Sequence, residues 1–79
     1  MSYESTFSEM KRAIDAAPRN AYVAEIHVQV LKHAHMLEQT SGKDFCAALG
    51  LTPSFGSEFL KMKKIAPRLR AAGLNPSKI

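Results

Sequence analysis

Prolines and glycine-containing breaks divide this chain into segments whose apolar residues repeat at helical intervals. The breaks fall at Pro18, at residues 40–42, at Gly50 and at Pro67. The segments between them carry neither an alternating strand pattern nor an Asn-Gly hairpin turn. A chain of 79 residues has room for only one domain. The sequence therefore predicts an all-α fold, a small bundle of four to five helices.

The N-terminal half predicts two helices that build the core. The first runs from about Ser5 to Ala16 and stops at Pro18. The second runs from about Asn20 to Gln39, with Asn20 as its N-cap. It carries two apolar stripes, one of Val23, Ile26, Val30, His33 and Leu37 and a second of Ala24, Val28, Leu31 and His35. The helix is therefore either buried within the monomer or lends its second stripe to a dimer interface.

The middle of the chain predicts a short third helix. It begins at residue 41 or 42 and ends at Leu49, because Gly50 tolerates the left-handed conformation of a helix end. A fourth helix follows, with Thr52 as N-cap and Pro53 at its first position.

The fourth helix is expected to bend or end near Ala66, since Pro67 is incompatible with a helix interior. The chain is thus a single domain in which residues 1–40 form the core helices and residues 41–73 a helix pair with a basic C-terminal segment. Residues 74–79 are expected to be a flexible tail.

Positive charge is concentrated in the second half of the chain. Residues 1–40 carry four basic and five acidic side chains, whereas residues 41–79 carry seven basic and two acidic ones. Five of the cations lie between Lys61 and Arg70. A one-sided basic field attracts polyanions, and such a run is suited to neutralising phosphates.

Residues 42–64, GKDFCAALGLTPSFGSEFLKMKK, meet the requirements of two helices joined by a tight turn. Gly50 supplies the turn conformation, and the small Cys46 stands four positions earlier, where the helices are expected to touch. This segment resembles the helix-turn-helix family of bacterial and phage DNA-binding regulators. It departs from the family at Cys46, where Ala is usual, and at Gly56, where Val or Ile is usual.

The resemblance implies a transcriptional regulator that reads double-stranded DNA, with the second helix in the major groove and the basic segment on phosphates. It implies that the contacts are made by Lys43, Thr52, Ser54, Ser57, Glu58, Lys61, Lys63, Lys64, Arg68 and Arg70. Glu58 either accepts from a cytosine amino group or pairs with Lys61. A homodimer through Ala24, Val28, Leu31 and His35 would read paired half-sites.

A second function stays open, because helix-turn-helix folds also bind proteins. Gly56 and Glu58 in the second helix favour an antiactivator or adaptor that docks on a transcription factor. The basic second half of the chain favours DNA instead.

Several classes of protein are not expected from this sequence. The single Cys46 forms no internal disulfide, and the three histidines lack the spacing and companions of a metal site. No set of nucleophile, base and orienting residue is present, so we expect no enzyme, cofactor or small-molecule substrate. The polar N-terminus is unlike a signal peptide, and no apolar run is long enough to cross a membrane. These features predict a cytoplasmic protein.

Overall fold

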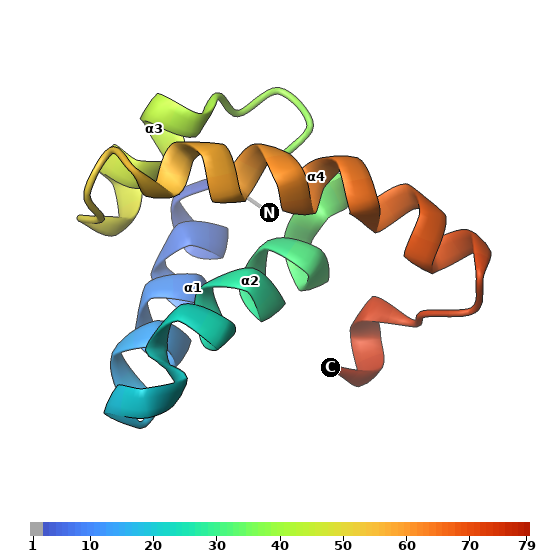
Figure 1. Cartoon of the computed structure of the whole chain (residues 1–79), viewed down its shortest axis with the longest axis horizontal. Coiled ribbons are helices and arrows are strands. Elements are labelled where there is room, and N and C mark those ends of the chain that lie inside the picture. The colour runs from blue at the N-terminus through green and yellow to red at the C-terminus, as the bar shows by residue number, and fades with distance from the viewer. Residues whose placement is uncertain (1–2) are drawn as a thin grey trace.

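The computed structural model describes residues 3–79 and places four α-helices in that range (Figure 1). They are α1 (Tyr3–Ala16), α2 (Tyr22–His33), α3 (Gly42–Leu49) and α4 (Phe55–Ala71). Short 3₁₀ turns lie at Arg19–Ala21, Ala34–Met36 and Pro76–Lys78. No strand occurs within residues 3–79, so the predicted all-α class is confirmed.

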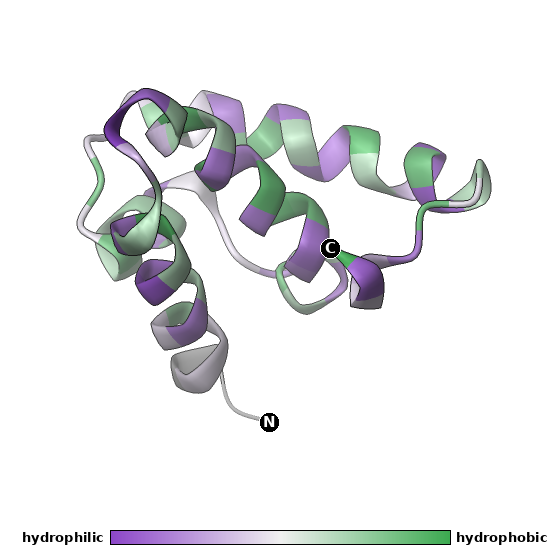
Figure 2. Ribbon diagram, turned by 90° about the horizontal axis from the view of Figure 1, so that it is seen from below, coloured by the Kyte–Doolittle hydropathy of each residue, from purple (hydrophilic) through white to green (hydrophobic). Residues whose placement is uncertain are grey.

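The four helices form two packed pairs that share one core. α1 packs against α2, α3 packs against α4, and α4 also contacts α2. In Figure 1, α4 runs below α3 and above α1 and α2, and the chain then folds back beneath its far end. Figure 2 shows the last turn lying beside α2.

Residues from all four helices fill this core. Its members are Met10, Ile14, Ile26, Val30, Leu37, Phe45, Cys46, Leu49 and Phe59. Phe45 of α3 and Phe59 of α4 stack with their ring centroids 4.3 Å apart. An aromatic pair of this kind contributes about 0.5–1.5 kcal/mol beyond the burial of its area.

The predicted start of the second helix is wrong. Residues 19–21 form a 3₁₀ turn after Pro18, closed by a hydrogen bond from the Ala21 amide to the Pro18 carbonyl (2.8 Å). α2 begins only at Tyr22, and Asn20 does not cap it. Because the helix starts later, Val23 lies at its outer end and is 47% exposed instead of buried.

The predicted end of the second helix is also wrong. α2 stops at His33, and the chain tightens into the 3₁₀ turn Ala34–Met36 instead of continuing to Gln39. The amide of Leu37 bonds to Ala34, three residues back, which places Leu37 fully in the core. Burial of this leucine therefore favours the turn over another helical step.

α3 has the predicted bounds, and its caps explain why. The Ser41 hydroxyl accepts from the Asp44 amide (3.1 Å), as an N-cap does. At the other end, Gly50 has φ = 67°, and the Leu51 amide returns to the Cys46 carbonyl (2.9 Å). A left-handed glycine with this bond is the Schellman ending of a helix.

The predicted start of the fourth helix is wrong, and of the two alternatives near Ala66, a bend or an end, the helix end is excluded. α4 begins at Phe55, after a turn in which the Phe55 amide bonds to the Thr52 carbonyl (3.1 Å), so Thr52 is not its N-cap. It then continues through Pro67 to Ala71. Pro67 is exposed and removes only the one bond that its missing N–H would make, while its neighbour Ala66 is buried and holds the helix against the core.

The segment predicted to be a flexible tail has a defined place. The Asn75 side chain accepts from the Ser77 amide (3.0 Å), and Pro76–Lys78 form a 3₁₀ turn that contacts α2. Within the described residues, no helix is both long and apolar enough to span a membrane.

Candidate nucleic-acid interface

Five polar side chains form one exposed stripe along α4 and its first turn. They are Ser54, Ser57, Lys61, Lys64 and Arg68, and all five are exposed. Their spacing alternates between three and four residues, which places them on one side of a helix. We call this set the outer stripe. It carries three cations and no acid, and it is available because α4 continues unbroken past Pro67.

Two further predicted contacts lie near the beginning of α4. Thr52 is exposed, and its hydroxyl lies 2.9 Å from that of Ser54. Lys43 is exposed on α3, directly after Gly42, whose backbone contacts that of Gly56. The contact between these glycines brings Lys43 to the same end of α4 as Ser54 and Ser57.

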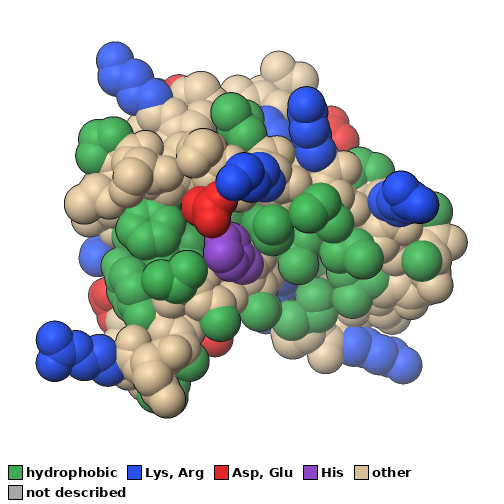
Figure 3. Space-filling model, in the orientation of Figure 1, with side chains coloured by type: hydrophobic (Ala, Val, Ile, Leu, Met, Phe, Trp, Pro, Cys, Tyr) green, Lys and Arg blue, Asp and Glu red, His purple; other side chains and the backbone are tan. Residues whose placement is uncertain are grey.

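Glu58 lies off the outer stripe, toward α2. Its carboxylate is 3.1 Å from the Lys61 ammonium and 3.7 Å from Nε2 of His27 on α2. The predicted pairing with Lys61 is thus present. Figure 3 shows a histidine side chain next to an acidic and a basic side chain, with apolar side chains on either side of this group. Glu58 therefore links α4 to α2 and also pairs with Lys61 of the outer stripe, while no ion pair of Lys64 or Arg68 is found within the described residues.

Lys63 is engaged within the molecule. Its ammonium donates to the carbonyls of Glu38 (3.1 Å) and Thr40 (3.0 Å) and lies 5.1 Å from the centre of the Phe59 ring. Lys63 thus ties the loop before α3 to α4. Lys63 stands directly before Lys64 in the sequence, and successive helical residues are rotated by about 100°, so its side chain leaves the helix on another side.

Arg70 likewise lies away from the outer stripe. It is two residues beyond Arg68 and lines a hollow with His33 and His35 of the segment at the end of α2. The ten residues predicted to bind DNA are therefore divided: seven lie on the outer stripe or near its start, and Glu58, Lys63 and Arg70 point elsewhere.

Two exposed apolar residues border the outer stripe, and the sequence analysis missed both. Leu60 is 50% exposed and Ile65 is 42% exposed. Both lie within the predicted fourth helix, and their helical phase relative to Phe59 is the signal that could have identified them. They give the cationic stripe apolar edges.

The stripe predicted for dimer contact is partly accessible. Ala24 and His35 are exposed, whereas Val28 and Leu31 are half-buried. This part of α2 is therefore neither a core face nor a wide apolar surface.

The buried thiol and histidines have no catalytic or metal-binding arrangement in the described part of the chain. Burial raises the pKa of the Cys46 thiol, which packs in the core. No group of three or more His, Cys, Asp or Glu side chains within residues 3–79 is placed to hold a metal ion.

His33 is buried, and Nε2 of its ring has no hydrogen-bond partner. Burial lowers its pKa below the ordinary value of 6.5; nearby Glu9 acts in the opposite direction, while Lys32 and His35 add to the lowering. The unfolded chain therefore binds this proton more readily than the folded one, so folding loses stability as the pH falls below about 6.5.

We predict that the unfolding temperature falls between pH 7.5 and pH 5.5 and that His33→Gln makes this fall shallower. Thermal unfolding followed by circular dichroism measures both slopes, and His35→Gln, at an exposed neighbour, is the control. Equal slopes in the wild type and His33→Gln would contradict this assignment.

Comparison with known proteins agrees with the arrangement of α3, the turn and α4. No curated protein and no solved structure shows a significant match to the chain. A family model described as an HTH-like domain matches residues 2–72, nearly the whole chain. The match extends well beyond the helix pair that carries the sequence resemblance and includes the core helices α1 and α2. The chain therefore belongs to the family of HTH-like domains.

Proposed function

We propose that this protein is a cytoplasmic regulator of transcription that binds double-stranded DNA through α4, with a binding role and no catalytic one. The observation that carries the proposal is the outer stripe: three cations and two serines on one face of the helix that follows the turn, with no acid among them. An α-helix fits into the major groove of DNA.

The roles of the stripe residues follow from their chemistry and position. Ser54 and Ser57 lie in the first turn, where a recognition helix meets base edges, and their hydroxyls donate to or accept from bases or phosphates. Lys61, Lys64 and Arg68 continue along the same face and are suited to phosphates. Lys43 and Thr52 extend the positive and polar surface at the beginning of the helix.

A dimer is part of this proposal. The molecule measures 31 × 27 × 25 Å, and two-fold dimers read half-sites about 34 Å apart. Two copies side by side would therefore place their α4 helices at about that distance. The accessible stripe of α2, with Ala24 and His35 exposed, is the surface we propose for the contact.

Fluorescence anisotropy with a labelled duplex from the region upstream of the gene, against a scrambled duplex, tests the function. We expect affinity to fall steeply with salt and the native duplex to bind at least about tenfold more tightly. A steep salt dependence without preference would leave only a basic surface. Absence of binding at low salt would overturn the proposal.

The exposed Leu60 and Ile65 support a second candidate, an adaptor that binds a protein partner. An amphipathic helix of a transcription factor could lie against these two residues while acids on it meet Lys61 and Lys64. Leu60→Ser with Ile65→Ser separates the candidates. It should leave DNA binding intact under the first function and abolish capture of the partner under the second.

A further inference from the structure

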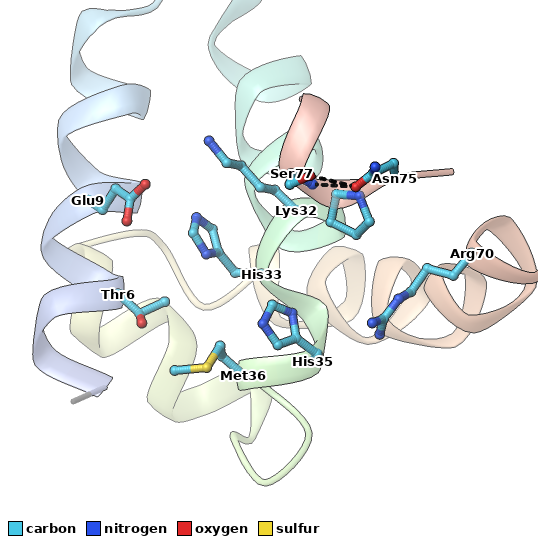
Figure 4. Close-up of a pocket in the computed structure, with 10 residues that line it drawn as sticks. Thr6, Glu9, Lys32, His33, His35, Met36, Arg70, Asn75 and Ser77 are labelled. Carbon is cyan, nitrogen blue, oxygen red and sulfur yellow. Dashed lines mark hydrogen bonds between the residues drawn. The ribbon is translucent and has the colours of Figure 1, made fainter. Parts of the chain in front are cut away.

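A hollow on the other side of α4 brings together residues from three helices and the C-terminal turn (Figure 4). Its volume is about 400 Å³, within the range of small-molecule sites, roughly 300–1,000 Å³. Thr6 and Glu9 of α1 line one side, and Arg70 and residues 75–77 line the other. Apart from His35, which also belongs to the stripe proposed for dimer contact, the residues that line this hollow have no part in the functions argued above.

Two permanent cations line the hollow without carboxylate partners. Neither Lys32 of α2 nor Arg70 of α4 forms an ion pair within the described part of the chain. Figure 4 shows Arg70 reaching from α4 toward His35, and Lys32 extending from α2 on the side of α1. Glu9 is the one acid in the lining, so the charge of the fixed ionic groups there is positive.

The remaining polar groups of the lining are suited to an anion more than to a cation. His33 and His35 contribute imidazole rings, and the Nε2 atom of His33 is buried without a partner. Ser77 contributes a hydroxyl, which donates to the Asn75 side chain (2.7 Å). The described residues hold no metal-binding group of three acids, histidines or cysteines, so a bare cation has no set of ligands here.

We propose that this hollow binds a small organic anion, a phosphate ester or a carboxylic acid, at the guanidinium of Arg70, while Lys32 adds positive charge on the side of α1 (Figure 4). Both anions present the delocalised oxygens that a guanidinium binds with two parallel hydrogen bonds. The lining also includes Met36 and Pro76, which can contact the apolar part of an organic ligand. Inorganic phosphate alone would leave most of the volume empty.

The position of Arg70 gives the ligand a route to the outer stripe. Arg70 is in the last turn of α4, the helix that carries Arg68, while Lys32 belongs to α2. An anion held by Arg70 next to His35 and Ser77 ties the end of α4 to the turn that follows α2 and to the C-terminal turn. The ligand thus fixes the C-terminal end of α4 relative to the core, which is how an effector would adjust DNA binding.

The test is a titration of the full chain with glycerol 3-phosphate, succinate, inorganic phosphate and chloride at matched ionic strength. Backbone amide shifts by NMR and the unfolding temperature report binding. We expect saturable shifts in residues 32–36 and 75–77 with one of the two organic anions and weaker effects with inorganic phosphate and chloride. The organic anion whose amide shifts saturate identifies the class of ligand.

Arg70→Gln and Arg68→Gln form a matched pair, because both arginines are exposed in the same two turns of α4. Arg70→Gln should weaken anion binding at least about tenfold, because it removes one charged hydrogen-bonding group. The DNA affinity measured without the anion should stay unchanged. Arg68→Gln should weaken DNA binding and leave anion binding unchanged. Equal loss of anion binding in both variants, or no saturable shift with any probe, would overturn the site without affecting the proposed DNA function.

Discussion

Replacing Lys61, Lys64 and Arg68 together with glutamine is expected to weaken duplex DNA binding about a hundredfold or more. Each substitution removes a charge-assisted contact to phosphate. A tenfold change in affinity corresponds to about 1.4 kcal/mol. Each phosphate contact also contributes about 0.9 to the slope of log affinity against log salt. The variant's slope should therefore be smaller by nearly three, a value that anisotropy titrations across a salt series measure directly.

The fold should survive these changes, because all three side chains are exposed. The only interaction lost within the molecule is the pair between Lys61 and Glu58, and surface ion pairs contribute about 0–1 kcal/mol. The unfolding temperature is therefore expected to change little. The matched control replaces Lys11, Arg12 and Arg19, three exposed cations outside α4, and removes the same net charge. If the control loses as much affinity as the stripe variant, net charge and not the stripe binds DNA.

Local sequence signals predict a helix end correctly where the residues that cap the helix are its neighbours in the sequence. Ser41 caps α3 through an amide three residues away, and Gly50 closes it through a bond that returns to Cys46. Both features depend on residues within one helical turn, so sequence rules predict them. The family resemblance of residues 42–64, which depends on the same features, is confirmed by the family match.

The errors arise where packing outweighs local preference. Pro67 suggested a bend or a helix end near Ala66, yet α4 continues past it to Ala71, with Phe59 and Ala66 buried against the core. That error affected the site as well. A helix that ended near Ala66 would place Arg68 in a separate element, whereas the continuous α4 aligns Arg68 with Lys61. Lys63 and Arg70 could be separated from the stripe only once the phase of the whole helix was known.

Gly56 is the clearest case in which a residue that looked unfavourable has a structural role. In the sequence, Gly56 departs from the helix-turn-helix family, which usually has Val or Ile at this position. In the structure, the backbones of Gly42 in α3 and Gly56 in α4 touch directly. A Cβ atom at Gly42 would lie 3.0 Å from the Gly56 carbonyl oxygen and 3.1 Å from its Cα. The pair therefore sets how closely α3 and α4 approach, and no pattern within either helix could predict this.

We predict that Gly42→Ala destabilises the domain by about 1–3 kcal/mol, the usual cost of overpacking against a backbone that has little freedom to move. For a domain of this size, each kcal/mol lowers the unfolding temperature by about 4–8 °C. Gly56→Ala is the matched comparison. Its Cβ would lie 3.6–3.7 Å from Gly42, an ordinary contact, and alanine is favoured over glycine in a helix by up to about 1 kcal/mol.

Thermal and urea unfolding of the two single variants and the double variant measure the asymmetry. Gly42→Ala should unfold at a lower temperature than the wild type, and Gly56→Ala at the same or a higher one. The double variant should lose more free energy of unfolding than the two single changes predict when added, because both new methyl groups occupy the same contact. Equal effects of the two single variants would show that α3 and α4 do not approach through this pair. Position 42 would then be free to carry the alanine that a helix prefers.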